Sequence, residues 1–308
     1  MKKILITLFV VILSSCSITD VTINATYVMA DNGIISKDSI LNIAAGISKI
    51  QKKRSTNKDL TLTEKEYKGS KYYEYKKENS DNVVILVHGG AFKLPLHQLY
   101  VKVMESVYNN SNKKYEMLLL DYKTEVKYPS QSLELEKILE YAYSKYKKVI
   151  LMGDSSGGNV ILSAIQKQRD ENKKLPDGLI LLSPWADPSN RVESRVTNFF
   201  KDVLFGNEDY PKELLRNKYL SEVKNLDNPY VSPVFGVYNN FPKTLIQVGE
   251  NEVLFDDSKI IYEKMKKVNV DVKFTVYKKM FHVFQLLQFL PETKQANIEM
   301  GQFIDSIF

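Results

Sequence analysis

The stretch Gly153-Asp154-Ser155-Ser156-Gly157-Gly158-Asn159 decides the fold of this chain. It follows the apolar run 148–152, which is typical of a buried strand, and it precedes 160–169, which is typical of a helix. The glycines two positions before and after Ser155 let strand and helix approach closely, so the serine hydroxyl is held exposed in a strained turn. The pattern therefore predicts a nucleophile elbow with Ser155 as the nucleophile. An ordinary Gly/Ser turn is the alternative.

A second glycine-containing turn, His88-Gly89-Gly90-Ala91-Phe92, ends the strand-like run 83–87. A glycine lets the backbone come close to the oxygen that becomes negative during acyl transfer. We predict that the N–H groups of Gly89 and Gly90, together with the N–H of Ser156, form an oxyanion hole.

The chain has three histidines, and their positions in the sequence indicate which of them is the general base. His88 belongs to the glycine turn and is interpreted as a supporting residue that shapes it, as is Asp154 beside the nucleophile. His97 lies in a helical stretch and is interpreted as a surface or packing residue. His282 follows the strand-like run 272–277 and is predicted to be the general base. Its alternative is a buried histidine among aromatic side chains.

A cluster of acidic residues follows the strand-like run 245–249. A carboxylate at this place orients an imidazole and stabilises the imidazolium. Glu250, Glu252, Asp256 and Asp257 are all candidates by position. The two aspartates are expected to cap the helix that follows, because carboxylates accept N–H groups at a helix start.

Several of these motifs occur in one order along the chain, and together they resemble the bacterial hormone-sensitive-lipase-like branch of the α/β-hydrolases. The matching segments are 88–92, 121–122, 153–159, 183–187, 231–233, 249–257 and position 282. The resemblance implies that Glu252 is the acid, although aspartate is commoner there. It also places Ala91 where many members carry a third glycine. Members of this branch are typically carboxylesterases that act on short acyl esters.

The N-terminus predicts export and lipidation. Met1-Lys2-Lys3 is a positive n-region, and 4–13 is an apolar segment too short to span a bilayer. The ending Leu13-Ser14-Ser15-Cys16 resembles the lipobox of bacterial lipoproteins, which implies cleavage before Cys16 and acylation of that residue. The alternative is a plain secretory signal, but Cys16 is the only cysteine of the chain and has no disulfide partner. We therefore expect a protein anchored by lipid to a membrane, in the bacterial cell envelope outside the cytoplasm.

Composition excludes other classes of protein. The formal charge is +6, and loss of Lys2 and Lys3 with the signal peptide leaves six minus two, or +4. This mild charge and the absence of a basic helix argue against binding to nucleic acid. Neither a metal-ligand cluster, a cysteine pair nor a dinucleotide fingerprint is found, so no metal or cofactor is predicted. A small-molecule ester is the expected partner, and the oligomeric state is left open.

The order of strand-like and helical runs predicts an α/β-hydrolase fold, with a mostly parallel central sheet flanked by helices and a helical cap. The expected strands are 62–76, 83–88, 116–120, 148–152, 179–182, 244–249 and 272–277. The expected helices are 37–51, 97–109, 131–146, 158–170, 257–268 and 291–307. Residues 1–15 are assigned to a signal peptide, 16–36 to a tether, and 37–308 to the catalytic domain. Cap elements are expected at 37–60 and 187–230, where Phe199, Phe200 and Phe205 are candidates for a substrate pocket; packing of the cap is the alternative role.

The sequence thus favours a serine carboxylesterase that works through a Ser155–His282–Glu252 triad and an acyl-enzyme. A serine peptidase or amidase stays open, since the same triad cleaves amides. So do a binding protein on the same fold and a structural lipoprotein with vestigial motifs.

Overall fold

The computed structural model describes residues 58–202 and 218–308. Its strands are β1 (Thr61–Tyr67), β2 (Ser70–Lys76), β3 (Asn82–Val87), β4 (Glu116–Leu120), β5 (Lys148–Asp154), β6 (Gly178–Leu182), β7 (Lys243–Gly249) and β8 (Val272–Tyr277). Its α-helices are α4 (Gln98–Asn109), α5 (Ser130–Lys145), α6 (Ser155–Asp170), α7 (Ser194–Thr197), α9 (Phe255–Lys267) and α10 (Pro291–Asp305), and two 3₁₀ turns are η2 (Pro233–Phe235) and η3 (Phe284–Leu286). The predicted signal peptide, the tether, the helix at 37–51, Cys16 and Phe205 lie outside these residues.

The described strands form one eight-stranded sheet in the order β1-β2-β4-β3-β5-β6-β7-β8. The pairs from β4 through β8 are parallel, whereas β1–β2 and β2–β4 are antiparallel. The central strands β3, β5 and β6 are continuous apolar runs because both of their faces are buried. The predicted fold class is confirmed by this arrangement.

One expected strand is wrong. The run 62–76 is not continuous but folds into the β1–β2 hairpin, which turns at Lys68 and Gly69. Both of these residues have positive φ angles, 50° and 80°, and a glycine takes such an angle without strain. The hairpin adds two antiparallel strands at one edge of an otherwise parallel sheet.

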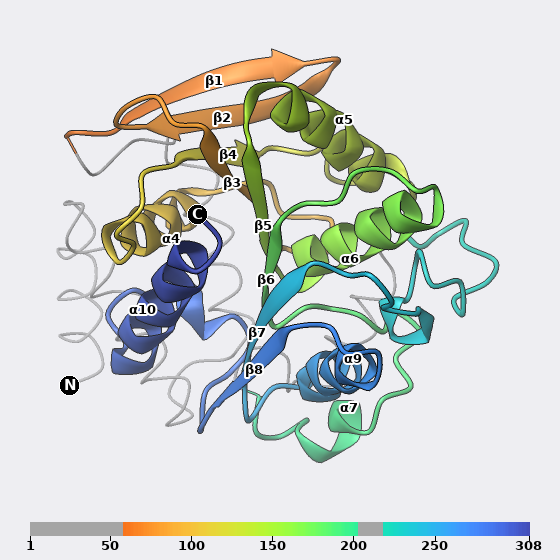
Figure 1. Cartoon of the computed structure of the whole chain (residues 1–308). Coiled ribbons are helices and arrows are strands. Elements are labelled where there is room, and N and C mark those ends of the chain that lie inside the picture. The colour runs from red at the N-terminus through yellow and green to blue at the C-terminus, as the bar shows by residue number, and fades with distance from the viewer. Residues whose placement is uncertain (1–57, 203–217) are drawn as a thin grey trace, which may run out of the picture. The chain divides into compact units, whose positions relative to one another are not determined.

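Helices cover both faces of the sheet, as Figure 1 shows. Helices α5, α6 and α9 lie on one face, and α4 and α10 lie side by side on the other. A separate apolar core fills the space beneath each layer, one around Leu151 and Ile161 and the other around Met152 and Met104. The two layers hold the strands rigidly, so the loops at the carboxyl ends of β3, β5, β7 and β8 are fixed relative to one another.

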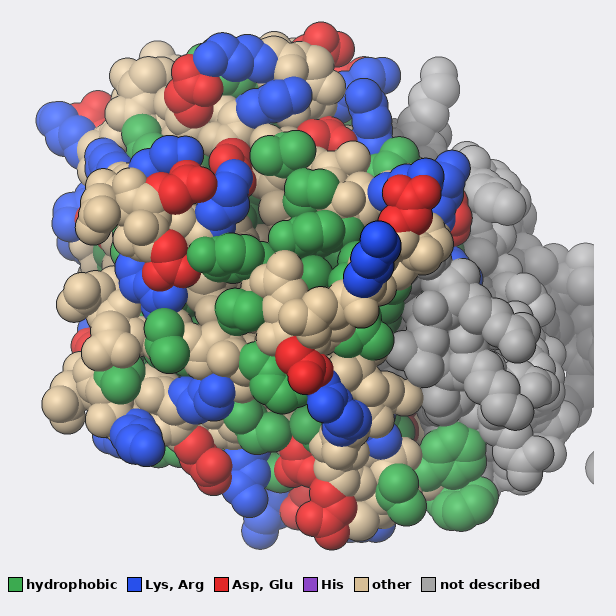
Figure 2. Space-filling model, turned by 90° about the vertical axis from the view of Figure 1, so that its right-hand side faces the viewer, with side chains coloured by type: hydrophobic (Ala, Val, Ile, Leu, Met, Phe, Trp, Pro, Cys, Tyr) green, Lys and Arg blue, Asp and Glu red, His purple; other side chains and the backbone are tan. Residues whose placement is uncertain are grey.

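The surface is mixed in character. On the face shown in Figure 2, basic and acidic side chains are interspersed rather than gathered into one charged patch. Over residues 58–202 and 218–308, no helix has both the length and the apolar character that crossing a membrane requires.

Candidate active site

The turn between β5 and α6 has the geometry of an elbow. Strand β5 ends at Asp154, helix α6 begins at Ser155, and Ser155 has a φ of 49°. Gly157 permits this turn, because a Cβ there would lie only 2.0 Å from the carbonyl oxygen of Val87 at the end of β3. The strained turn presents the Ser155 side chain above the carboxyl end of the sheet, with 7% of the residue exposed.

The structure brings Ser155, His282 and Glu252 together. The imidazole Nε2 of His282 lies 3.0 Å from Ser155 Oγ, and its Nδ1 lies 3.0 Å from Glu252 Oε2. In this arrangement the serine hydroxyl donates to Nε2, and Nδ1–H donates to the carboxylate. The three residues follow β5, β8 and β7, so loops far apart in sequence meet at one end of the sheet.

Further donors hold the other oxygen of the Glu252 carboxyl. Ser183 Oγ donates to Glu252 Oε1 over 2.7 Å, and the backbone N–H of Gly249 donates to the same oxygen over 2.5 Å. With His282 on Oε2, both oxygens of this buried carboxyl accept hydrogen bonds. Donors around a carboxylate favour its ionised form.

Burial acts on both members of the His282–Glu252 pair. It raises the pKa of the Glu252 carboxyl, an effect that the Ser183 and Gly249 donors oppose. Burial also lowers the pKa of His282. The nearby negative charges of Asp202 and Asp257 raise this pKa, and the positive charge of Arg195 lowers it. Because burial prevails, the imidazole is kept neutral, which is the form that accepts a proton from a serine hydroxyl.

The prediction that Gly89 donates to an oxyanion is wrong. Its N–H already donates to Asp154 Oδ1 over 2.7 Å. No hydrogen-bond acceptor within the described ranges engages the N–H of Gly90 or of Ala91, and Ser156 lies in the first turn of α6, where N–H groups lack helical acceptors. Ala91 therefore replaces Gly89 in the candidate oxyanion hole.

Asp154, the residue before the nucleophile, links the turn to neighbouring elements through hydrogen bonds. Its Oδ2 accepts a hydrogen bond from the Tyr100 hydroxyl over 3.0 Å, while its Oδ1 binds Gly89 N–H. Burial raises the pKa of Asp154 to about 7, and the hydrogen bonds from Gly89 and Tyr100 oppose that rise. The carboxyl thus joins the nucleophile elbow to the glycine turn and to α4.

His88 takes part in packing the glycine turn. Its Nδ1 lies 2.7 Å from the carbonyl oxygen of Gly89, and its ring stacks on Tyr122 with centroids 4.0 Å apart. The Tyr122 hydroxyl donates to the His88 carbonyl over 2.7 Å. His97 precedes α4 and its ring lies 4.4 Å from that of Tyr100, so it too is placed among packing contacts.

The expectation that Asp256 and Asp257 cap their own helix is wrong. Asp257 Oδ1 accepts the N–H groups of Ala186 and Asp187, both over 2.7 Å, and its carboxylate pairs with Arg195. Asp256 Oδ2 accepts the N–H of Ser194 over 2.7 Å. Both carboxylates therefore hold the segment after β6 through its backbone N–H groups.

One of the predicted pocket residues, Phe200, lies at the surface. Phe200 is 88% exposed, and it contacts Phe199 edge-on with centroids 5.1 Å apart. A ring so exposed does not enclose an acyl chain, so the assignment of Phe200 is wrong for this conformation. The N-terminal part of the predicted cap lies largely outside the described residues.

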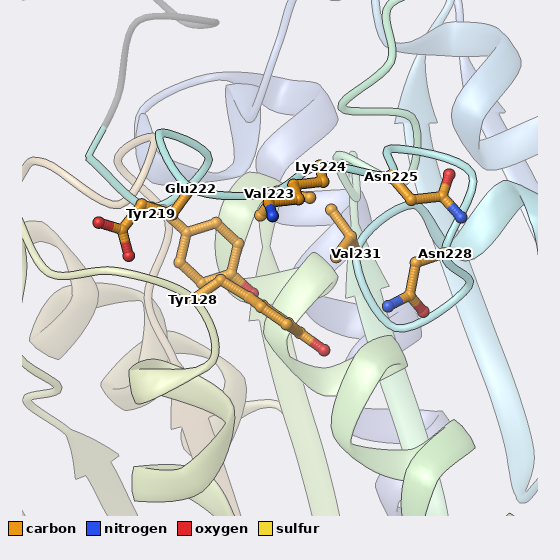
Figure 3. A pocket seen from close by; sticks show the side chains of 8 residues that line it. All are labelled: Tyr128, Tyr219, Glu222, Val223, Lys224, Asn225, Asn228 and Val231. Atoms are coloured by element: carbon orange, nitrogen blue, oxygen red, sulfur yellow. The ribbon is translucent and has the colours of Figure 1, made fainter.

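A pocket of about 360 Å³ lies nearby, lined by Tyr128, Tyr219, Glu222, Val223, Lys224, Asn225, Asn228 and Val231 (Figure 3). Neither Ser155 nor His282 lines it. Tyr219 stacks on Phe92 of the glycine turn, with centroids 3.9 Å apart. The pocket therefore lies beside the glycine turn 88–92.

Sequence reasoning missed Ser183, Asn198 and Asp202, which surround the Glu252 loop. Ser183 opens a segment that carried the family resemblance, so a signal for it was present. Asn198 and Asp202 lie in the insertion after β6 and had no signal of their own. Within the described ranges, no group of three or more His, Cys, Asp or Glu side chains is arranged to hold a metal ion.

The sequence profile of the alpha/beta hydrolase fold family matches residues 84–286, so the chain belongs to that family. An esterase of Acinetobacter venetianus is 30% identical over 235 residues, which cover 74% of this chain and 76% of that protein. An acetyl-hydrolase of Streptomyces hygroscopicus is 32% identical over 158 residues, covering 51% of this chain and 52% of that protein.

Solved structures agree on the fold. An esterase from the bacterial hormone-sensitive lipase family superposes with a TM-score of 0.79 at 23% identity, covering 92% of this chain and 97% of that one. The α/β-hydrolase part of the resemblance is therefore confirmed, and the placement in the hormone-sensitive-lipase-like branch stays a prediction.

Proposed function

We propose that this chain is a serine carboxylesterase that hydrolyses short-chain acyl esters through Ser155, His282 and Glu252. The observation that carries the proposal is the unbroken hydrogen-bonded chain from Glu252 through His282 to Ser155, with both contacts at 3.0 Å. The ester hydrolase class rests on the family and on relatives that are esterases and acetyl-hydrolases.

In the proposed mechanism each of these residues has a distinct role. Ser155 Oγ attacks the ester carbonyl while His282 Nε2 takes its proton, and Glu252 stabilises the imidazolium that forms. The N–H groups of Gly90, Ala91 and Ser156 receive the oxyanion. His282 then protonates the leaving alcohol, and a water molecule activated by the same imidazole releases the acid and restores Ser155.

Short acyl groups are the favoured substrates because two supports agree. The branch that the motifs resemble acts on short esters, and the relative from Streptomyces is an acetyl-hydrolase. Amides are the competing substrates, since the same residues perform amide cleavage.

Lipidation of Cys16 is the second part of the proposal. It rests on the apolar segment 4–13 and on the uniqueness of Cys16 in the chain. Acylation would hold the enzyme at a membrane of the bacterial cell envelope, outside the cytoplasm. Detergent phase partitioning tests this: the wild-type protein should enter the detergent phase after processing, and Cys16→Ser should not. Equal partitioning into the aqueous phase would exclude the anchor.

A fluorophosphonate probe and a panel of esters and amides test the enzymatic part. Ser155→Ala should abolish labelling and reduce turnover by about four orders of magnitude. Ser163→Ala is the matched control, because Ser163 is buried about two turns further along α6 and, among the described residues, its hydroxyl donates to Asn159 Oδ1 over 3.4 Å. Turnover that survives Ser155→Ala would refute the nucleophile, and faster cleavage of amides than of matched esters would favour an amidase.

A further inference from the structure

The segment 194–202 lies in the insertion between β6 and β7. It buries polar side chains and exposes apolar ones, the opposite of the usual arrangement. Ser194, Asn198 and Asp202 recur at four-residue intervals and are 2%, 7% and 0% exposed. Val196 and Phe200, on the other side of this segment, are 77% and 88% exposed. Most buried polar side chains have hydrogen-bond partners, so the inward face of this segment is expected to make specific contacts.

Those contacts are made with the backbone around Glu252. Asn198 Nδ2 donates to the carbonyl oxygen of Glu252 over 3.0 Å and to that of Glu250 over 3.1 Å. Asp202 Oδ2 accepts the N–H of Val253 over 2.9 Å. The Glu252 carbonyl and the Val253 N–H belong to one peptide unit, so that unit is held at both ends, once by each side chain.

Ser194 extends the same set of contacts. Its Oγ donates to the carbonyl oxygen of Val253 over 2.8 Å and accepts the N–H of Asp256 over 3.1 Å. The loop from Glu250 to Leu254 has neither helical nor strand hydrogen bonding of its own. The Glu252 carbonyl also accepts the Phe255 N–H over 3.1 Å, and the N–H groups of Glu250 and Asn251 donate to backbone carbonyls at the end of β8 and just after it. The remaining partners are side chains of a segment about 50 residues away in sequence.

We propose that Asn198 and Asp202 are positioning residues for Glu252. This inference rests on the proposed function, because it assigns to the two residues the task of fixing the triad acid. The rotation of the 252–253 peptide sets the direction in which the Glu252 side chain leaves the backbone. A carboxylate misplaced by a fraction of an ångström loses its contact with either His282 or Ser183, and catalysis depends on such placement.

A double-mutant cycle tests the proposal on the full chain. Asn198→Ala should lower kcat by about 10- to 100-fold and leave KM within about twofold, because the residue acts on the acid and not on the substrate. In a Glu252→Ala background the same change should cost less than about twofold, because there is no carboxylate left to position. Thr197→Ala is the matched control, since Thr197 lies in the same turn but is exposed, and it should match the wild type.

The outcomes separate this proposal from its competitors. An equal loss in both backgrounds would mean that Asn198 only stabilises the fold, and no loss in either would refute its role. Failure of the triad itself would appear independently, as wild-type turnover in the Glu252→Ala protein.

If Asn198→Ala does not fold, two variants of Asp202 test the proposal instead. Asp202→Asn keeps an oxygen that can accept the Val253 N–H, whereas Asp202→Ala does not. Recovery by Asp202→Asn of most of the kcat lost in Asp202→Ala would support positioning through this hydrogen bond. Equal kcat losses in the two variants would overturn it.

Discussion

Ser183→Ala removes the hydroxyl that donates to the proposed catalytic acid and that also accepts the Val283 N–H over 3.4 Å. The Ser183 hydroxyl donates to Glu252 Oε1 over 2.7 Å in a site where neither residue is exposed to solvent. Hydrogen bonds to charged groups contribute about 1.5–3 kcal/mol. Because about 1.4 kcal/mol corresponds to a tenfold change in rate, loss of the bond should lower kcat/KM by about 10- to 150-fold.

The reason for the loss is electrostatic. When His282 becomes an imidazolium, the Glu252 carboxylate must stay ionised to stabilise it. Without the Ser183 donor, burial raises the pKa of that carboxyl further, and the ionised form is less available.

The assay is hydrolysis of short p-nitrophenyl esters, with thermal melting as a check on folding. Ser232→Ala is the matched control, because Ser232 is equally buried and its hydroxyl has no hydrogen-bond partner in the described part of the chain. A folded Ser183→Ala protein with kcat/KM within twofold of the wild type would refute the reasoning.

Three further predictions concern pH, packing and charge. Burial lowers the pKa of His282, and the base must be neutral to accept a proton. As the pH decreases, kcat/KM should therefore fall with a midpoint below about 6.5. A midpoint above that value in the pH–rate profile would contradict this reasoning. Gly157→Ala would place a Cβ 2.0 Å from the Val87 carbonyl oxygen and should destabilise the fold by about 3 kcal/mol or more, measured by urea unfolding, so an unchanged midpoint would be inconsistent with this packing. Lys145→Met removes an ammonium that pairs with the buried Glu74 carboxylate over 3.2 Å. The substitution should lower the free energy of unfolding by up to about 3 kcal/mol in the same assay. Equal stability of the variant and the wild type would show that the other contacts of Glu74 are enough to stabilise its charge.

The sequence was informative wherever one residue type and its neighbours decide the local structure. Continuous apolar runs predicted the buried strands, and glycines around Ser155 predicted the turn that β5 and α6 form. The position of His282 and of an acidic cluster followed because parallel strands bring their carboxyl ends to one edge of the sheet. The choice of Glu252 within that cluster came from the family resemblance. The structure places both side chains within 3.0 Å of a partner in the proposed triad.

The assignment of individual hydrogen-bond donors could not be predicted in this way. The partner of Gly89 N–H is Asp154, 65 residues away, and only the packed structure shows that this donor is occupied. The partners of Asn198 and Asp202 are backbone groups more than 50 residues away. Such contacts depend on how two loops meet, and no local pattern records that. The β1–β2 turn at Lys68 and Gly69 had a local signal, the glycine. The run 62–76 was nevertheless assigned to strand as a whole, because its flanking residues on both sides have strand character.

The length of the glutamate side chain explains how Glu252 can act as the proposed acid at a position where the resemblance leads one to expect aspartate. The carboxyl of Glu252 must accept from His282 on one oxygen and from both Ser183 and the Gly249 N–H on the other. An aspartate attached to the same peptide would be shorter by one carbon–carbon bond, or about 1.5 Å, and its oxygens could not reach both sets of donors. The loop would then have to move toward His282. The hydrogen bonds that Asn198 and Asp202 make to its backbone oppose that movement. The extra methylene of glutamate and the anchored loop are therefore matched to each other, and a change in one requires a change in the other.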